Sequence, residues 1–181
     1  MALKATVFKA RIQLSDMDRH VYTEKNMTIA RHPSETDMRM MLRVLAWGLY
    51  ADDRLEFTRG LCEDDEPELW QKSFSDEIEL WIDLGMPDET RLKKACGRAK
   101  QVVVLAYGDR SVPIWWEKNQ GKFSRFDNLS VVFVGEEGAE ALAAMAARTM
   151  DLSINISDGE VAISSNEGYV QLEPEYLRRA Q

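Results

Sequence analysis

The sequence has little of what histidine metal centres, disulfide frameworks and membrane spans require. Its 181 residues include only two cysteines and two histidines, too few for a zinc site or a disulfide-stapled fold. No apolar run approaches the roughly 18 residues of a membrane-spanning helix, and lysines interrupt the N-terminal segment before it reaches signal-peptide length. We therefore expect a cytoplasmic protein with reduced thiols and no contact with membranes.

Positive charge is also in the minority. Lys and Arg number 23 against 31 Asp and Glu, which gives a net charge of −8. This balance argues against non-specific coating of nucleic acid or of anionic membranes, because such binding comes from cations that neutralise phosphates. The hydrophobic fraction of 45% is enough to bury a sizeable core, so the chain is predicted to be globular.

Hydrophobic periodicity predicts one mixed α/β domain over residues 1–181. Alternation over 5–14 and 20–30 indicates a β-hairpin, and Ser34 is expected to cap a helix of about five turns, with Asp37 completing a capping box. The remaining pattern predicts strands at 55–59, 69–74, 78–84, 101–107, 129–134, 152–156 and 161–164, and helices at 87–100 and 136–149. The stretch 113–125 is aromatic and basic.

Charge is strongly segregated in the middle of the chain. Residues 63–89 contain 11 acids and one cation, whereas residues 91–125 contain nine cations and two acids. One interpretation is that the acids hold divalent cations against a phosphate-bearing substrate bound by the basic, aromatic stretch. The other is that the two blocks pair with each other as ordinary ion pairs. The sequence leaves both open.

Three carboxylates are candidate metal ligands. Asp83 lies near the end of the predicted strand 78–84, and Glu79 on the same strand face is about 13 Å away, too far to share one ion. Glu68 opens an extended segment, and Glu35 falls near the apolar stripe of the first predicted helix. The structural alternatives are a solvated strand acid for Asp83, a loop acid for Glu68 and support of the helix N-terminus for Glu35.

Several strings are specific enough to identify a family. The runs ARHPSETDMRMMLRVLAWGLYADDRLEFTRGLC, DDEPELW, LWIDLG, PDETRLKKACGRA and IWW resemble the YaeQ family of small bacterial proteins, and the likeness covers nearly the whole chain. The resemblance implies a variant of the PD-(D/E)XK nuclease fold. This is a restriction-endonuclease-like mixed β-sheet flanked by helices, shared with Holliday-junction resolvases.

That superfamily pattern can be laid on the acidic residues of this sequence. By resemblance, Glu35 matches a helical glutamate found in many members. Pro67-Glu68 matches the Pro-Asp element, with Glu in place of Asp. Asp83 matches the acidic member of the (D/E)XK element.

The superfamily lysine has no counterpart at its usual place. Gly85 stands two residues after Asp83, where the pattern has lysine. The resemblance implies a lysine relocated to the following helix, where Lys93 and Lys94 are the candidates. Helical periodicity favours Lys93, the length of a lysine stem keeps Lys94 open, and Lys72 is a third candidate.

These features predict an Mg²⁺- or Mn²⁺-dependent phosphodiesterase acting on nucleic acid. Glu68 and Asp83, helped by Glu35, would bind the metal, and Lys93 or Lys94 would act on the attacking water. Nucleic acid is expected to bind through segment 91–125, or the chain works with a protein partner. The alternatives are a non-catalytic binding or regulatory protein on the nuclease scaffold, and a hydrolase of small phosphorylated metabolites.

Two further expectations concern the strand 78–84. Trp81 shares a face with Asp83 and is predicted to pack under the first helix. Two carboxylates at Glu68 and Asp83, about 5 Å apart, would repel each other. Asp83→Asn is therefore expected to stabilise the metal-free protein.

Overall fold

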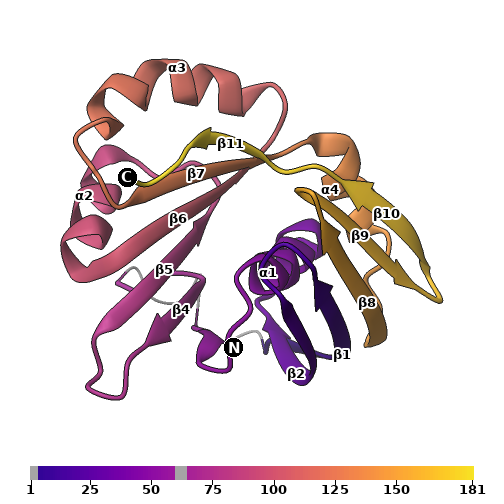
Figure 1. Cartoon of the computed structure of the whole chain (residues 1–181). Coiled ribbons are helices and arrows are strands. Elements are labelled where there is room, and N and C mark those ends of the chain that lie inside the picture. The colour runs from indigo at the N-terminus through magenta and orange to yellow at the C-terminus, as the bar shows by residue number, and fades with distance from the viewer. Residues whose placement is uncertain (1–3, 60–64) are drawn as a thin grey trace. The chain divides into compact units, whose positions relative to one another are not determined.

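The computed structural model describes residues 4–59 and 65–181 and divides the chain into two compact units (Figure 1). The first unit comprises Met1–Ala51 and Glu137–Pro174, and the second comprises Asp52–Glu136 and Glu175–Gln181. Each unit contains one mixed sheet with helices, so the chain is a mixed α/β protein as its pattern predicts. The expectation of a single domain stays a prediction. In the described residues, no helix has the length and apolarity needed to cross a membrane.

The first unit is built on a five-stranded sheet in the order β10-β9-β8-β1-β2. β1 and β8 pair in parallel, and the other neighbours pair antiparallel. The predicted N-terminal hairpin is confirmed, whereas β10 was not predicted. The elements are β1 (Thr6–Asp16), β2 (Val21–Arg31), α1 (Asp37–Leu49), α4 (Glu136–Ala143, whose first residue belongs to the second unit), β8 (Thr149–Ser157), β9 (Glu160–Ser165) and β10 (Gly168–Leu172).

Helix α1 begins later than its sequence pattern predicts. Its N-cap is Thr36, whose side chain accepts a hydrogen bond from the Arg39 amide at 3.1 Å. Ser34 does not take the predicted capping role, because its hydroxyl contacts the His32 ring Nδ1 at 2.6 Å instead. The helix therefore has 13 residues and is shorter than the predicted five turns.

The C-terminal end of α1 is capped by a residue from the β1–β2 turn. The Arg19 guanidinium donates to the carbonyls of Gly48 and Ala51 at 3.4 and 3.3 Å, and α1 has no basic residue in its own last turn. Arg19 is held by Asp16, which is 1% exposed and accepts from Arg19 Nε at 2.7 Å. The hairpin turn thus supplies the positive charge that the carbonyl end of a helix favours.

The second unit is built on a six-stranded sheet in the order β11-β7-β6-β5-β4-β3. β5, β6 and β7 run parallel, and the remaining pairs are antiparallel. α2 connects β5 to β6 and α3 connects β6 to β7, because neighbouring parallel strands need a long crossover connection, which is usually a helix. The elements are β3 (Leu55–Phe57), β4 (Leu69–Lys72), β5 (Ile78–Leu84), α2 (Glu89–Arg98), β6 (Ala99–Tyr107), α3 (Ser111–Phe123), β7 (Leu129–Val134) and β11 (Glu175–Arg178).

The helices α2 and α3 bury one face of this sheet. Trp81 of β5 is 2% exposed and lies in a hydrophobic cluster with Leu92 and Ala95 of α2 and with Phe123 of α3. Its burial is confirmed, but the prediction that the first helix covers it is wrong. Asp83 lies two residues further along β5, on the same strand face, and therefore also points toward α2.

We expect Arg19→Gln to destabilise the protein by about 1.5–3 kcal/mol, the range for hydrogen bonds that involve a charged group. The variant loses the bonds to Asp16, Gly48 and Ala51 together. Arg11→Gln is the matched control, because Arg11 is exposed and pairs with Glu24 and Asp151 on the surface. Its cost should stay below about 1 kcal/mol. Urea unfolding of the wild type and the two variants measures both losses of unfolding free energy. Equal losses in Arg19→Gln and Arg11→Gln would show that Arg19 does not stabilise the end of α1.

Candidate functional site

Asp83 is buried and bound by an arginine of α2. Its Oδ2 accepts from Arg91 Nε at 2.8 Å and its Oδ1 accepts from Arg91 Nη2 at 2.9 Å, which is a bidentate pair. Strand β5 ends one residue after Asp83, and α2 starts after a connection of four residues. The first turn of α2 therefore lies beside the strand end, where the long side chain of Arg91 reaches Asp83.

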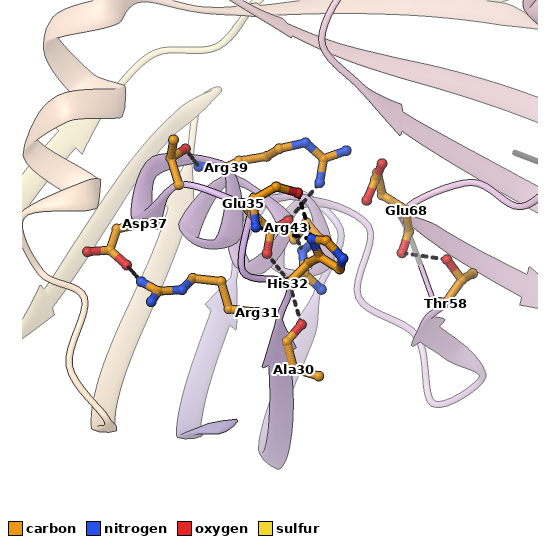
Figure 2. A network of polar contacts seen from close by, with 11 residues as sticks. Ala30, Arg31, His32, Glu35, Asp37, Arg39, Arg43, Thr58 and Glu68 are labelled. Atoms are coloured by element: carbon orange, nitrogen blue, oxygen red, sulfur yellow. Dashed lines mark hydrogen bonds and ion pairs between the residues drawn. The ribbon is translucent and has the colours of Figure 1, made fainter. Parts of the chain in front are cut away.

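Glu68 lies immediately before β4, which is the strand adjacent to β5. It is 6% exposed, and its amide donates to the Ile82 carbonyl at 2.9 Å. Its own carbonyl accepts from the Thr58 amide at 3.1 Å, and Figure 2 shows Thr58 beside it. The backbone of Glu68 is thus fixed on both sides, and the structure places Glu68 and Asp83 at neighbouring strand ends of one sheet.

Within the described residues, none of the three candidate lysines forms an ion pair with Glu68 or Asp83. Lys93 is exposed, Lys94 pairs with Asp65, and Lys72 pairs with Asp76 at 3.4 Å. Their catalytic role stays a prediction. The cation that the structure brings to Asp83 is Arg91, which sequence reasoning missed.

A signal for Arg91 was present in the sequence. It stands four residues before Ala95, so it lies beside the buried stripe of α2, and it belongs to the first turn of the helix that follows the strand of Asp83. The superfamily pattern names lysine at this place, although an arginine fork matches a carboxylate better than lysine does.

The acidic and basic blocks pair with each other at several points. Glu89 contacts Lys122 and Arg125, and Glu77 contacts Lys100 at 3.5 Å. Together with Asp65–Lys94 and Asp83–Arg91, these contacts connect the 63–89 segment to the 91–125 segment. The pairing interpretation of the charge segregation is therefore confirmed for these residues.

Glu35 lies in a buried ion cluster in the first unit. Its Oε2 accepts from Arg39 Nη1 at 2.7 Å and from Arg43 Nε at 3.1 Å, and its Oε1 accepts from Arg43 Nη2. Arg43 also donates to the Ala30 carbonyl at 3.1 Å, which ties α1 to the end of β2 (Figure 2). Both carboxylate oxygens of Glu35 are thus occupied. Its proposed metal-binding role would require the two arginines to move.

Glu68 and Asp83 offer two carboxylates to a divalent cation. Carboxylate oxygens are the hard ligands that Mg²⁺ and Mn²⁺ prefer, and Mg²⁺ is commonly held by one or two carboxylates with several waters. Glu68 and Asp83 fit that chemistry, and Asp83 already binds a cation in the form of Arg91. Residues 4–59 and 65–181 contain no group of three or more His, Cys, Asp or Glu side chains arranged to hold an ion.

Cys96 is the cysteine within the described residues, since Cys62 lies outside them. Cys96 is half-buried and forms no disulfide. Burial raises the pKa of its thiol to about 11, slightly offset by Arg178. A thiol that stays protonated at neutral pH is a poor nucleophile, so Cys96 is not a candidate catalytic residue.

The pKa of Cys96 predicts a pH profile for its alkylation. In a Cys62→Ser variant, the rate of reaction with iodoacetamide should rise through pH 9 and 10 toward a midpoint near pH 11. The thiolate is the reacting form, and burial disfavours it. A midpoint near pH 8.5, the value of an unperturbed thiol, would show that Cys96 is open to solvent.

The Glu35 cluster makes a prediction about stability. We expect Arg43→Met to cost about 3–5 kcal/mol, because it leaves a buried carboxylate with less compensation. Glu35→Gln combined with Arg43→Met should recover a large part of that loss. Arg31→Gln is the control, since Arg31 pairs with the half-exposed Asp37. Thermal unfolding compares the four proteins, and a double variant no more stable than Arg43→Met would contradict the buried-charge account.

The two mixed sheets and their helices define the class of the molecule, a mixed α/β protein. Comparison with known proteins then gives its family. The family profile described as YaeQ protein matches residues 1–174, and the chain belongs to the YaeQ family.

Relatives support this assignment over nearly full length. The YaeQ protein of Escherichia coli (strain K12) is 49% identical over 172 residues, covering 95% of both chains. The YaeQ protein of Salmonella typhi is 47% identical over 173 residues, covering 96% of both. The crystal structure of YaeQ protein from Xanthomonas axonopodis pv. citri is similar, with a TM-score of 0.95, 47% identity, and coverage of 98% of this chain and 99% of that chain. The YaeQ protein from Pseudomonas syringae has a TM-score of 0.92, 35% identity and 97% coverage of both chains.

Proposed function

We propose that this protein is a metal-dependent phosphodiesterase of the PD-(D/E)XK type that acts on nucleic acid with Mg²⁺ or Mn²⁺. One observation carries the proposal. Two buried carboxylates, Glu68 and Asp83, lie at neighbouring strand ends of one mixed sheet, at the positions that the superfamily resemblance assigns to metal ligands. A restriction-endonuclease-like sheet is part of the proposal.

In this proposal Glu68 and Asp83 hold the ion, and the rest of the coordination is completed by water and a phosphate oxygen. A bound Mg²⁺ or Mn²⁺ supplies Lewis-acid polarisation of phosphate and a more acidic water. The fixed backbone of Glu68 and the strand position of Asp83 keep both carboxylates oriented without loop closure. Glu35 is a further ligand only if Arg39 and Arg43 withdraw from it.

A lysine of α2 has the proposed task of orienting the attacking water and offsetting charge in the transition state. Lys93 and Lys94 are both exposed on α2. Lys94 is the more constrained of the two, because it must first leave Asp65, whose pKa it lowers through their hydrogen bond. The structure therefore gives Lys93 the freer side chain, as helical periodicity also favours.

Binding of nucleic acid is proposed through segment 91–125. Lys93, Arg110 and Lys118 have no ion-pair partner within the described parts of the chain, unlike the paired cations of this segment. A cleft of about 630 Å³ between the start of α2 and one face of α3 carries Lys118 and Lys122 beside Trp115 and Ile114. Cations beside a half-buried tryptophan suit a single-stranded chain, whose bases stack on aromatic side chains and whose phosphates pair with cations.

A second candidate function is favoured by the Asp83–Arg91 pair. An uncompensated carboxylate pair is costly to keep without a metal, but here Arg91 neutralises Asp83 through both oxygens. The acids are thus compatible with a non-catalytic protein that keeps the scaffold for binding or regulation. The two functions differ in whether an ion enters at Asp83.

Thermal unfolding in the presence of metal separates the two functions. The wild type should melt at a higher temperature in excess Mn²⁺ than in chelator, since a ligand at a hundredfold excess over Kd stabilises the folded state by about 2.7 kcal/mol. Asp83→Asn should lose most of that increment. Because this change also removes the partner of Arg91, it should destabilise the metal-free protein, the reverse of what repulsion between two carboxylates predicts.

Glu79→Gln is the matched control for this experiment. Glu79 lies on the same strand as Asp83 but pairs with Arg54 at 3.0 Å, so this variant should keep the metal increment. Cleavage of single-stranded DNA, double-stranded DNA and RNA oligonucleotides in Mn²⁺ then tests the reaction itself. A wild type without any metal increment would leave the non-catalytic function as the better one.

A further inference from the structure

We propose that Arg91 is the resident counter-cation of the Asp83 site and that a divalent metal binds there only by displacing it. The inference deepens the proposed function, because it names the group that sets the metal affinity of the same site. It makes Arg91 a positioning and regulatory residue rather than a ligand or a catalytic residue.

The contacts of Arg91 place its guanidinium where a metal has to bind. Two of its nitrogens occupy both oxygens of Asp83, at 2.8 and 2.9 Å. Nη2 also donates to the carbonyl of Glu66 at 3.0 Å, two residues before Glu68. The guanidinium therefore joins β5 to the segment that leads into Glu68, the two backbone segments that carry the candidate ligands.

The two partners differ in their access to solvent. The Arg91 side chain is 31% exposed, whereas that of Asp83 is 3% exposed. The backbone of Asp83 is held in place, because β5 is a central strand that pairs with β4 on one side and β6 on the other. The partly exposed Arg91 side chain can withdraw toward solvent and leave the carboxylate behind. The movable member of the pair is thus the cation, as exchange for a metal requires.

This arrangement keeps Asp83 neutralised in both states. With Arg91 in place, the buried carboxylate has the partner that its desolvation demands. With an ion bound, the metal takes over that task. The apparent metal affinity is then the intrinsic affinity reduced by the fraction of molecules in which Arg91 has withdrawn.

Displacement of Arg91 also affects the acidic segment before β4. Arg91, Lys94 and Arg98 lie on one face of α2, at spacings of three and four residues. Lys94 pairs with Asp65, and Arg98 donates to the Asp65 carbonyl at 2.8 Å. Withdrawal of Arg91 breaks its hydrogen bond to the Glu66 carbonyl. The contacts of Lys94 and Arg98 with Asp65 stay in place. The segment remains attached to α2 while the site opens next to Glu68.

The test measures the binding of Mn²⁺ to Arg91→Gln by electron paramagnetic resonance of the free ion. Arg91→Gln should bind Mn²⁺ about tenfold more tightly than the wild type or better, because the competing cation is gone. In chelator it should melt at a lower temperature than the wild type, and Mn²⁺ should raise its melting temperature more. Arg91→Lys keeps the positive charge but not the bidentate contact. Its Mn²⁺ affinity should therefore lie between that of the wild type and that of Arg91→Gln.

Arg98→Gln is the matched control. It removes the same charge from the same face of α2 and also breaks a bond to a backbone carbonyl, without touching Asp83. Its Mn²⁺ affinity should stay within about twofold of the wild type, since a distant exposed charge is screened. If Arg91→Gln and Arg98→Gln gained equally in Mn²⁺ affinity, the change in net charge alone would explain the gain, and the inference would be overturned.

Two further outcomes separate this inference from the proposed function. If the wild type binds Mn²⁺ through Asp83 and Arg91→Gln binds no more tightly, the role of Arg91 is refuted while the metal site stands. If Arg91→Gln binds Mn²⁺ and the wild type does not, the inference is supported and the metal-dependent function of the wild type fails. Mn²⁺ binding that survives in Arg91→Gln combined with Asp83→Asn would place the ion elsewhere and overturn the inference.

Discussion

Neutralisation of buried carboxylates by arginine is the interaction on which both units of this protein depend. A carboxylate that leaves water requires an opposite charge and several N–H donors. Such ion pairs join Asp16 with Arg19, Glu35 with both Arg39 and Arg43, and Asp83 with Arg91. In each case the arginine also donates to a backbone carbonyl or comes from a helix, so it fixes a turn, a helix end or a strand end. The polar groups of the interior are therefore part of how the elements are held together.

The same interaction gives the site its two interpretations. The proposed function makes Asp83 a metal ligand, and its contact with Arg91 makes it a satisfied structural acid. These descriptions conflict only if the pair is permanent. In the proposed exchange, the partly exposed Arg91 gives way to a metal while the Asp83 carboxylate stays in place. Such an exchange would allow both a stable metal-free fold and the proposed metal-binding function.

Local pattern predicted most of the strands and much less of the side-chain pairing. The hairpin, the strand Ile78–Leu84 and the strand Leu129–Val134 follow from clear alternation or short buried runs, and the structure has them. Helix α3 was missed because Trp115, Trp116 and the neighbouring lysines give no amphipathic period, and its burial depends on the sheet beneath. The cap of α1 was misplaced by two residues because His32 competes for Ser34, a local contact that the capping pattern does not include.

The candidate site shows the same limit. The carboxylates could be selected from sequence because strand alternation and the family resemblance both mark them. The place of Arg91 in the first turn of α2 is a weaker signal, since the superfamily pattern names lysine and periodicity alone does not show how far a side chain reaches back to a strand end. The sign expected for Asp83→Asn changed for this reason: a repulsion between two acids was assumed, and an attraction to a third residue is present.

A crystal structure of the protein soaked in Mn²⁺, with anomalous data collected at the manganese edge, tests the central claim most directly. The account predicts an anomalous peak about 2–2.5 Å from carboxylate oxygens of Glu68 and Asp83, with the Arg91 guanidinium withdrawn from Asp83. Density without such a peak, with Arg91 still bidentate on Asp83 at saturating Mn²⁺, would contradict it.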